Sequence, residues 1–167
     1  MSNTVETRIR DRLDDKWLTP SQKAVWEAIQ RFDGPPHRVI NIYGTEGTGK
    51  TFMGWFLERM NYSAYSIRPE LYKPLLSRLT LDDVFPDRTT TRDLRPLVDK
   101  YGLQQIILLT RIRVDERAMP TFELRMTEDD LANFRANLYR HLQLTIPEED
   151  YRNYKVALDR LSLDRLS

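Results

Sequence analysis

The residues best suited to chemistry form one short run: Gly44, Thr45, Glu46, Gly47, Thr48, Gly49, Lys50 and Thr51. The chain has only 6 glycines, and three of them fall in this run. Glycine adopts backbone angles that other residues resist, and without a Cβ it lets N–H groups approach a phosphate closely. A helix that begins near Lys50 would direct the positive end of its dipole to the same place. The run therefore predicts a phosphate-binding turn, in which Lys50 reaches the β- and γ-phosphates and the Thr51 hydroxyl binds Mg²⁺.

The run fits the pattern G-x-x-x-x-G-K-[ST] and resembles the Walker A motif of P-loop NTPases. A strand-like segment over residues 38–43 (RVINIY) precedes it, and apolar residues at helical spacing follow from Lys50 to Met60. Within that superfamily the chain most resembles RecA-like and AAA-type ATPase domains. The resemblance implies an ATP–Mg²⁺ site at the C-terminal edge of a parallel sheet.

P-loop enzymes need a further acid, usually at the end of a neighbouring strand, to hold Mg²⁺ through water. One candidate pair is Asp82-Asp83, which follows a strand-like segment, and the other is Asp115-Glu116. Order along the chain favours Asp82 as the metal-side acid and Asp83 as the base that orients water, because a helix and the strand QIILLT follow, as in RecA-like and AAA-type ATPases. Thr110, at the tip of that strand, would then resemble the sensor residue. These ATPases usually carry Glu where this chain has Asp83, and an ordinary strand-end turn remains an alternative.

Gln22 lies upstream of the glycine run, in the segment Leu18-Thr19-Pro20-Ser21-Gln22. The segment resembles the adenine-contacting Q motif of superfamily 1 helicases, which makes Gln22 a candidate nucleotide contact. The alternative is a solvated residue in the first turn of a helix. A helicase motor needs two RecA-like lobes and this chain has length for one, so we do not expect an autonomous translocase.

Composition excludes several kinds of site. The 167 residues include no cysteine, which rules out disulfides and thiolate chemistry, and the two histidines, His37 and His141, cannot form a zinc site without several carboxylates. A net charge of +1 gives no strong attraction to nucleic acid or anionic membranes. The N-terminal segment carries charges throughout, and no apolar run is long enough to span a membrane. We therefore expect a cytoplasmic protein.

Strand-like and helix-like segments alternate along the chain, which predicts an α/β fold with a mainly parallel sheet flanked by helices. The expected strands are 38–43, 63–67, 78–84, 105–110 and 121–126, and the principal expected helices are 20–32, 50–60, 92–101 and 127–142, with a last helix from Pro147. Three segments follow from this pattern: an N-terminal helical extension over 1–37, a P-loop core over 38–126 and a C-terminal helical segment over 127–167.

Arginines cluster where a partner could use them. In oligomeric ATPases an arginine from one subunit often completes the site of its neighbour. The candidates are Arg111, Arg113, Arg117, Arg88 and Arg92. Taken singly, a solvated polar connection is the more ordinary reading of each of them. A second basic group could face a nucleic acid backbone, although acidic residues at 128–130 dilute it; its members are Arg125, Arg135 and Arg140.

Three functions are compatible with these residues. The first is a small Mg²⁺-dependent ATPase subunit that acts as a nucleotide switch, or as an oligomeric component of a larger assembly. The second is a small-molecule kinase, although such kinases begin almost directly at the first strand. The third is a nucleotide-binding adaptor that does not hydrolyse ATP, which the short carboxylate of Asp83 keeps open. GTP is not favoured, because the sequence contains no N-K-x-D pattern.

Overall fold

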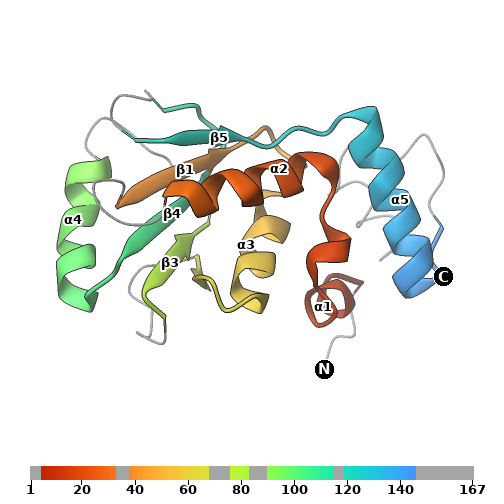
Figure 1. The fold of residues 1–167 in the computed structure, drawn as a ribbon, viewed down its shortest axis with the longest axis horizontal. Coiled ribbons are helices and arrows are strands. Elements are labelled where there is room, and N and C mark those ends of the chain that lie inside the picture. The colour runs from red at the N-terminus through yellow and green to blue at the C-terminus, as the bar shows by residue number, and fades with distance from the viewer. Residues whose placement is uncertain (1–4, 33–37, 68–75, 83–89, 115–118, 146–167) are drawn as a thin grey trace.

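The computed structural model describes residues 5–32, 38–67, 76–82, 90–114 and 119–145. Within these ranges the strands form one sheet in the order β2-β3-β4-β1-β5, and every neighbouring pair is parallel (Figure 1). The strands are β1 (Val39–Tyr43), β2 (Ala64–Ser66), β3 (Arg78–Leu81), β4 (Gln105–Thr110) and β5 (Thr121–Glu123). The predicted α/β fold with a parallel sheet is therefore confirmed.

Helices flank this sheet, as the sequence predicts. They are α1 (Val5–Arg10), α2 (Pro20–Ile29), α3 (Lys50–Arg59), α4 (Thr90–Tyr101) and α5 (Glu128–Leu142), with the short 3-10 helices η1 (Asp15–Trp17) and η2 (Gln30–Phe32). The helix expected from Pro147 lies outside the described residues. None of the helices in the described ranges has the length and apolar character that crossing a membrane requires.

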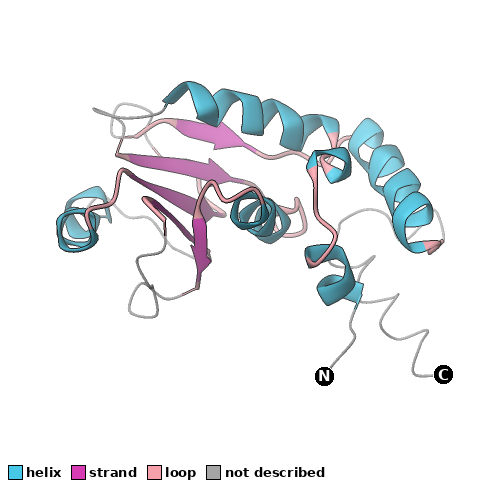
Figure 2. Cartoon of the chain, turned by 60° about the horizontal axis from the view of Figure 1, so that its bottom comes forward, coloured by secondary structure: helices cyan, strands magenta, loops and turns pink. Residues whose placement is uncertain are grey.

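Two apolar clusters cover opposite faces of the sheet. Ile107 and Leu109 of β4 belong to one cluster, whereas Ile106 and Leu108 belong to the other. Successive side chains of a strand point to opposite faces, so this division separates the two sides. Helix α4 contributes to the second cluster, and α1, α2, α3 and α5 contribute to the first. Figure 2 shows the strands between helices on either side.

The strand order brings several strand ends to one edge. Strand β4 is buried along its whole length and lies between β1 and β3. Tyr43, the last residue of β1, pairs with Thr110 of β4 and with Glu123 of β5. Because all strands run parallel, the loops that leave their C-terminal ends emerge together. The glycine run after β1 and Asp82 after β3 therefore meet at this edge.

Local signals explain where the helices begin and end. Capping boxes start two of them: Thr19 with Gln22 at α2, and Thr127 with Asp130 at α5. Gly102 has φ 60° directly after α4, which is the left-handed geometry that terminates helices. Three predicted strands end earlier than expected: β2 at Ser66, β3 at Leu81 and β5 at Glu123.

The segments before and after the sheet share one core with it. The Trp17 ring packs 6.4 Å from the Phe52 ring of α3 and stacks 4.8 Å from His141 of α5. The Asn137 Nδ2 of α5 donates a hydrogen bond to the Trp17 carbonyl at 3.1 Å. A single apolar cluster therefore joins residues of the N-terminal extension, the sheet and α5.

Candidate functional site

The glycine run forms the connection between β1 and α3. Its first backbone N–H, that of Gly44, donates to the Thr110 carbonyl at the end of β4 at 3.1 Å. Gly47 and Gly49 have φ values of 81° and 86°, in the region that favours glycine. Gly49 is also the residue that caps α3, so the turn closes directly onto the helix N-terminus. The predicted strand, turn and helix are all present.

Gly44 lies too close to its neighbours to carry a side chain. A Cβ placed on it would lie 2.3 Å from the Thr48 Oγ1 and 2.9 Å from the Leu124 carbonyl oxygen. The Thr48 hydroxyl is itself held by a hydrogen bond to the Thr45 carbonyl at 2.9 Å. The close packing of the first residue of the turn against Thr48 and Leu124 therefore requires glycine at position 44.

Lys50 folds back across the turn. Its Nζ donates to the Gly44 carbonyl at 2.6 Å and to the Thr45 carbonyl at 2.8 Å. The first N–H groups of a helix have no partner within the helix, and they carry the positive end of its dipole. The ammonium group and the α3 N-terminus thus create a strongly electropositive turn, which suits an anion such as a phosphate.

Thr51 and Asp82 meet beside this turn. The Thr51 Oγ1 donates to the Asp82 Oδ2 at 2.7 Å, across 31 positions of sequence. Asp82 is 8% exposed, and its backbone N–H donates to the Ser66 carbonyl of β2 at 3.0 Å. The structure therefore brings together the two residues that the sequence predicts for Mg²⁺.

Tyr65 of β2 joins this pair. Its hydroxyl donates to the same Asp82 Oδ2 at 2.5 Å. Burial, followed by the hydrogen bond to Asp82 and the charge of that carboxylate, raises the pKa of Tyr65 well above its usual range. The phenol is therefore protonated at neutral pH and acts as a donor.

These donors fit Mg²⁺ only in combination with a phosphate. Among the described residues, no group of three or more His, Cys, Asp or Glu side chains could hold a metal by itself. Mg²⁺ usually binds one or two carboxylates and completes its shell with water and substrate phosphates. One hydroxyl and one carboxylate beside an electropositive turn match that pattern.

A cavity of about 320 Å³ lies beside the turn. Two ion pairs border it: Arg111 with Glu46 at 4.0 Å, and Arg125 with Glu123 at 2.8 Å. The hydrogen bond from Arg125 lowers the pKa of Glu123. The residues of the turn that line the cavity are Gly44, Thr45, Glu46, Gly47 and Thr48. Positively and negatively charged side chains therefore line this cavity together with the residues of the turn.

Gln22 is buried in the first turn of α2. It is 1% exposed, so the interpretation as a solvated first-turn residue is wrong. Its Oε1 accepts a hydrogen bond from the Thr19 N–H at 3.0 Å, as part of the capping box of α2. Its Nε2 is buried and has no hydrogen-bond partner within the described residues. Gln22 does not line the cavity beside the turn.

Several predicted residues lie outside the described ranges. They are Asp83, Arg88, Asp115, Glu116 and Arg117. The roles predicted for them, including that of Asp83 as the base, stay predictions. Asp82 is the one acid of the two candidate pairs that the structure describes, and it contacts Thr51.

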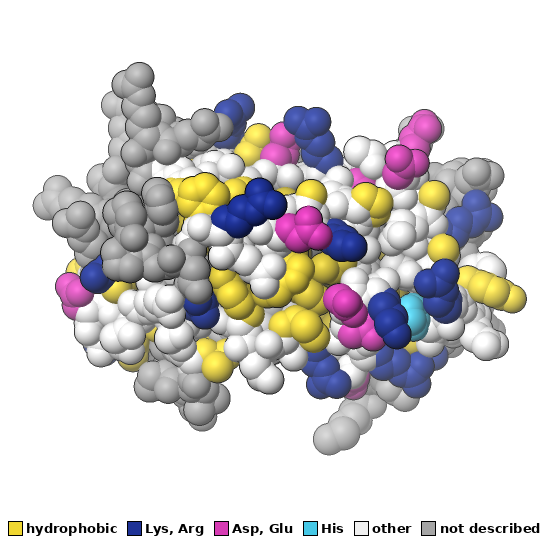
Figure 3. All heavy atoms as spheres, in the orientation of Figure 1, with side chains coloured by type: hydrophobic (Ala, Val, Ile, Leu, Met, Phe, Trp, Pro, Cys, Tyr) yellow, Lys and Arg dark blue, Asp and Glu magenta, His cyan; other side chains and the backbone are white. Residues whose placement is uncertain are grey.

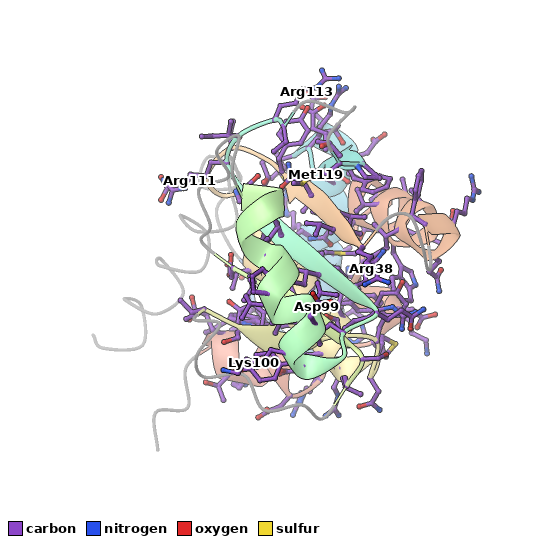
Figure 4. The ribbon with its side chains drawn as sticks, turned by 90° about the vertical axis from the view of Figure 1, so that its left-hand side faces the viewer. Arg38, Asp99, Lys100, Arg111, Arg113 and Met119 are labelled. Atoms are coloured by element: carbon purple, nitrogen blue, oxygen red, sulfur yellow. The ribbon has the colours of Figure 1, made fainter. Side chains whose placement is uncertain are left out.

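Thr110 and the nearby arginines lie at the same sheet edge. The single hydroxyl proton of Thr110 is shared between two acceptors, the Asn41 Oδ1 at 2.8 Å and the Ile112 carbonyl oxygen at 2.9 Å. Arg111 and Arg113 lie near one end of α4, whereas Arg38 and Asp99 lie towards its other end (Figure 4). Arg111 contacts the turn of its own chain through Glu46, which places it in cis to this site.

Sequence reasoning missed two contributors. Tyr65 is the first, because nothing in its own segment marks it as a partner of Asp82. Gly54 is the second: a Cβ on it would lie 2.6 Å from the Tyr65 Cδ2. A glycine inside a helical pattern often marks close packing, and that signal could have drawn attention to Gly54.

Comparison with known proteins finds similarity in structure alone. No protein-family model matches the sequence, and a search of curated proteins finds no significant match. A replication initiator DnaA bound to AMPPCP and single-stranded DNA has 17% sequence identity and a TM-score of 0.58, over 94% of this chain and 67% of that one. AMPPCP-bound DnaA from Aquifex aeolicus has 18% identity and a TM-score of 0.59, over 93% of this chain and 67% of that one. Domain III of DnaA from Thermotoga maritima has 16% identity and a TM-score of 0.51, over 92% of this chain and 88% of that one.

These likenesses define the fold class. The chain has an α/β fold with a five-stranded parallel sheet flanked by helices, and this fold is shared with the DnaA structures. The chain spans about two thirds of the first two of these structures. At such low identity the comparison concerns fold, and function has to be argued from the site.

Proposed function

We propose that this chain binds ATP with Mg²⁺ through the turn 44–51 and acts as a small ATPase subunit, either a nucleotide switch or an oligomeric component of a larger assembly. The observation that carries the proposal is the 2.7 Å contact between Thr51 and Asp82 beside Lys50 at the start of α3. Lys50 would thus provide a cation for phosphate, its neighbour Thr51 a hydroxyl for the metal, and the distant Asp82 a carboxylate for the water shell of the metal. The AMPPCP in the descriptions of two structurally similar proteins also supports an adenine nucleotide.

Each residue has a defined part in this proposal. The N–H groups of the turn bind phosphate oxygens, and the Lys50 Nζ leaves its carbonyl partners to reach the β- and γ-phosphates. Thr51 would be a ligand of Mg²⁺, Asp82 would accept a hydrogen bond from a water of the metal, and Asp83 would orient the attacking water. When bound, Mg²⁺ neutralises charge that develops on the phosphates. Gln22 stays a candidate contact to the nucleotide, since its buried Nε2 has no partner among the described residues.

Calorimetric titration of ATP and GTP with Mg²⁺ tests the proposal, with phosphate release followed on the same samples. We expect ATP to bind the wild type and to lose affinity for Lys50→Ala. Lys23→Ala is the matched control, because Lys23 is exposed on α2. The absence of binding by the wild type, or equal binding by Lys50→Ala, would contradict the proposal. Binding without turnover would favour the non-hydrolysing adaptor, and turnover only with an added phosphate acceptor would favour the kinase.

Nucleic acid is a secondary candidate partner. One structurally similar DnaA is described with single-stranded DNA. Arg135 and Arg140 are exposed on α5, and Arg12 donates to the His141 carbonyl at the end of the same helix. Figure 3 shows basic side chains around the histidine, with acidic side chains close by. This mixture predicts weak, strongly salt-dependent binding, which anisotropy of a labelled single strand would measure.

A further inference from the structure

Tyr65 connects three parts of the candidate site. Its hydroxyl and the Thr51 hydroxyl both donate to the Asp82 Oδ2, from β2 and α3 respectively. A carboxylate held by one donor can still rotate about its Cβ–Cγ bond. Donors from two different elements restrict that rotation, because each one fixes a different direction of approach to the same oxygen.

Contacts with α1 and α3 hold the backbone and the ring of Tyr65 in place. The Glu58 Oε2 accepts a hydrogen bond from the Tyr65 backbone N–H at 3.1 Å, while the Glu58 Oε1 pairs with Arg10 at 2.8 Å. The Arg10 guanidinium lies 5.8 Å from the centre of the Tyr65 ring and 5.5 Å from that of Trp55. Glu58 of α3 thus holds the Tyr65 backbone, and Arg10 of α1 lies over the Tyr65 ring.

Gly54 lets the ring reach this position. A Cβ at Gly54 would lie 2.6 Å from the Tyr65 Cδ2 and 2.7 Å from its Cε2. Glycine inside a helix costs about 1 kcal/mol relative to alanine, so a purely local criterion would favour alanine here. The contact with Tyr65 supplies the reason for glycine, since the ring packs directly on the helix backbone.

We infer that Tyr65 is a positioning residue for metal binding: its hydroxyl orients Asp82 so that the carboxylate can accept a hydrogen bond from a water of Mg²⁺. The inference rests on the proposed function. It extends that function to two residues outside the glycine run. The affinity for the metal should depend on Tyr65 of β2, and on Gly54, which makes room for the Tyr65 ring.

The test is the affinity for Mn²⁺ in the presence of ATP, measured by electron paramagnetic resonance on the full chain. Tyr65→Phe removes the hydroxyl and keeps the ring. Loss of residues that orient metal ligands typically weakens metal binding about 10-fold to 100-fold, and we expect a loss in this range. Affinity for ATP without metal should be unchanged, which a purely structural role in holding the fold would not predict. Tyr139→Phe is the control, since Tyr139 is 64% exposed on α5.

Gly54→Ala provides a second variant that keeps the hydroxyl but displaces the ring. It should lose Mn²⁺ affinity as Tyr65→Phe does. The free protein offers an independent measurement: the ¹³Cζ resonance of Tyr65, assigned through Tyr65→Phe, should shift in Asp82→Asn. No shift would overturn the inference.

The failure of the inference can be distinguished from that of the proposed function. If the wild type binds Mn²⁺–ATP and Tyr65→Phe binds it equally well, the inference alone is overturned. If the wild type binds neither ATP nor Mn²⁺–ATP, the proposed function fails and the inference fails with it. A metal-specific loss in both variants, with the control unchanged, supports the inference.

Discussion

At the residue scale, the site depends on a few side chains and on two glycines whose neighbours leave no space for a Cβ. Lys50, Thr51 and Asp82 supply charge, hydroxyl and carboxylate, while Gly44 and Gly54 supply room. The first kind of contribution is chemical and can be read from residue types. The second is steric, and it becomes visible only when the neighbours of each glycine are known.

Gly44→Ala should abolish nucleotide binding and leave the fold intact. The new Cβ would approach the Thr48 Oγ1 to 2.3 Å, and the displaced Thr48 hydroxyl would lose its bond to the Thr45 carbonyl. The start of the turn would then shift, and its N–H groups would no longer be placed to bind the same phosphate. Calorimetry with Mg²⁺–ATP measures the loss, and circular dichroism checks the fold. Unchanged affinity would show that the geometry of this turn does not determine binding.

Thr51→Val should separate metal binding from nucleotide binding. Valine keeps the shape of threonine but removes the hydroxyl that meets Asp82. We expect Mg²⁺ to increase the affinity for ATP less in Thr51→Val than in the wild type. The affinity for ATP in the presence of a chelator should stay the same. Thr45→Val is a matched control from the same turn, since its carbonyl and not its hydroxyl accepts the bonds from Lys50 and Thr48. Equal Mg²⁺ dependence in the wild type and Thr51→Val would contradict the assigned role.

At the element scale, much of the fold could be predicted from the sequence. The run QIILLT predicts β4 correctly because an uninterrupted apolar segment is typical of a central parallel strand, and Thr127 predicts the start of α5 because its hydroxyl caps the helix. Sheet order was not predictable in the same way, since it depends on pairing between distant segments. The contact of Tyr65 with Asp82 follows from that pairing, in which Tyr65 lies beside Thr80 in the neighbouring strand. Sequence reasoning therefore identified the turn and Asp82 but missed the residue that orients Asp82.

Asp130 joins two of these elements and gives the stability a dependence on pH. Its carboxylate accepts hydrogen bonds from the Ser21 N–H and hydroxyl at the start of α2, and from the Thr127 N–H and hydroxyl at the start of α5. Burial alone would raise the pKa of Asp130, but these hydrogen bonds outweigh it and lower the pKa. The folded state therefore binds this proton less readily than the unfolded state does. The stabilisation is present above the unfolded pKa of about 4 and is lost as pH falls towards the folded value.

Asp130→Asn should remove most of this effect. We expect it to lower the free energy of unfolding at pH 7 by about 1.5–3 kcal/mol, the usual contribution of hydrogen bonds to a charged group. The difference from the wild type should shrink as pH falls below about 4, where the wild-type carboxyl group also becomes protonated. Urea denaturation at several pH values measures both. A difference that stays constant down to acid pH would contradict the assigned ionisation. Asp129→Asn, an exposed neighbour, is the control.

At the scale of the whole molecule, α1, α5 and α3, the helix that follows the glycine run, share one core. Trp17 lies at their junction, 1% exposed, between Phe52 of α3 and His141 of α5. Residues outside the glycine run thus support the helix whose N-terminus faces the proposed phosphates. Changes at this junction should alter the site through the position of α3.

Trp17→Ala tests this connection. Removing a large buried aromatic side chain typically costs about 3–5 kcal/mol of stability, and we expect a loss of that size in urea denaturation. Trp26→Ala is a useful comparison, because Trp26 is only partly buried and packs on Phe56 and Tyr62. A loss below that of Trp26→Ala would contradict a central role for Trp17.

The proposed role in an assembly makes a kinetic prediction. If a neighbouring subunit completes the site with an arginine, turnover per chain should rise with protein concentration. The rise should fall in the concentration range where sedimentation detects association. Arg113→Ala should lower turnover, and mixing it with Lys50→Ala should restore part of it, because one mixed interface would carry both residues. Turnover that is independent of concentration and is not restored by mixing would contradict the involvement of Arg113 in trans.

The most direct test of the central claim is a titration of the ¹⁵N-labelled chain with Mg²⁺–ATP, followed by NMR of the backbone amides. We expect the largest shifts at Gly47, Gly49 and Lys50, whose N–H groups would bind the proposed phosphates at the start of α3. Unmoved amides in this turn at saturating ATP, or shifts confined to the cavity of about 310 Å³ near Arg38 and Gly102 at the other end of the sheet, would contradict it.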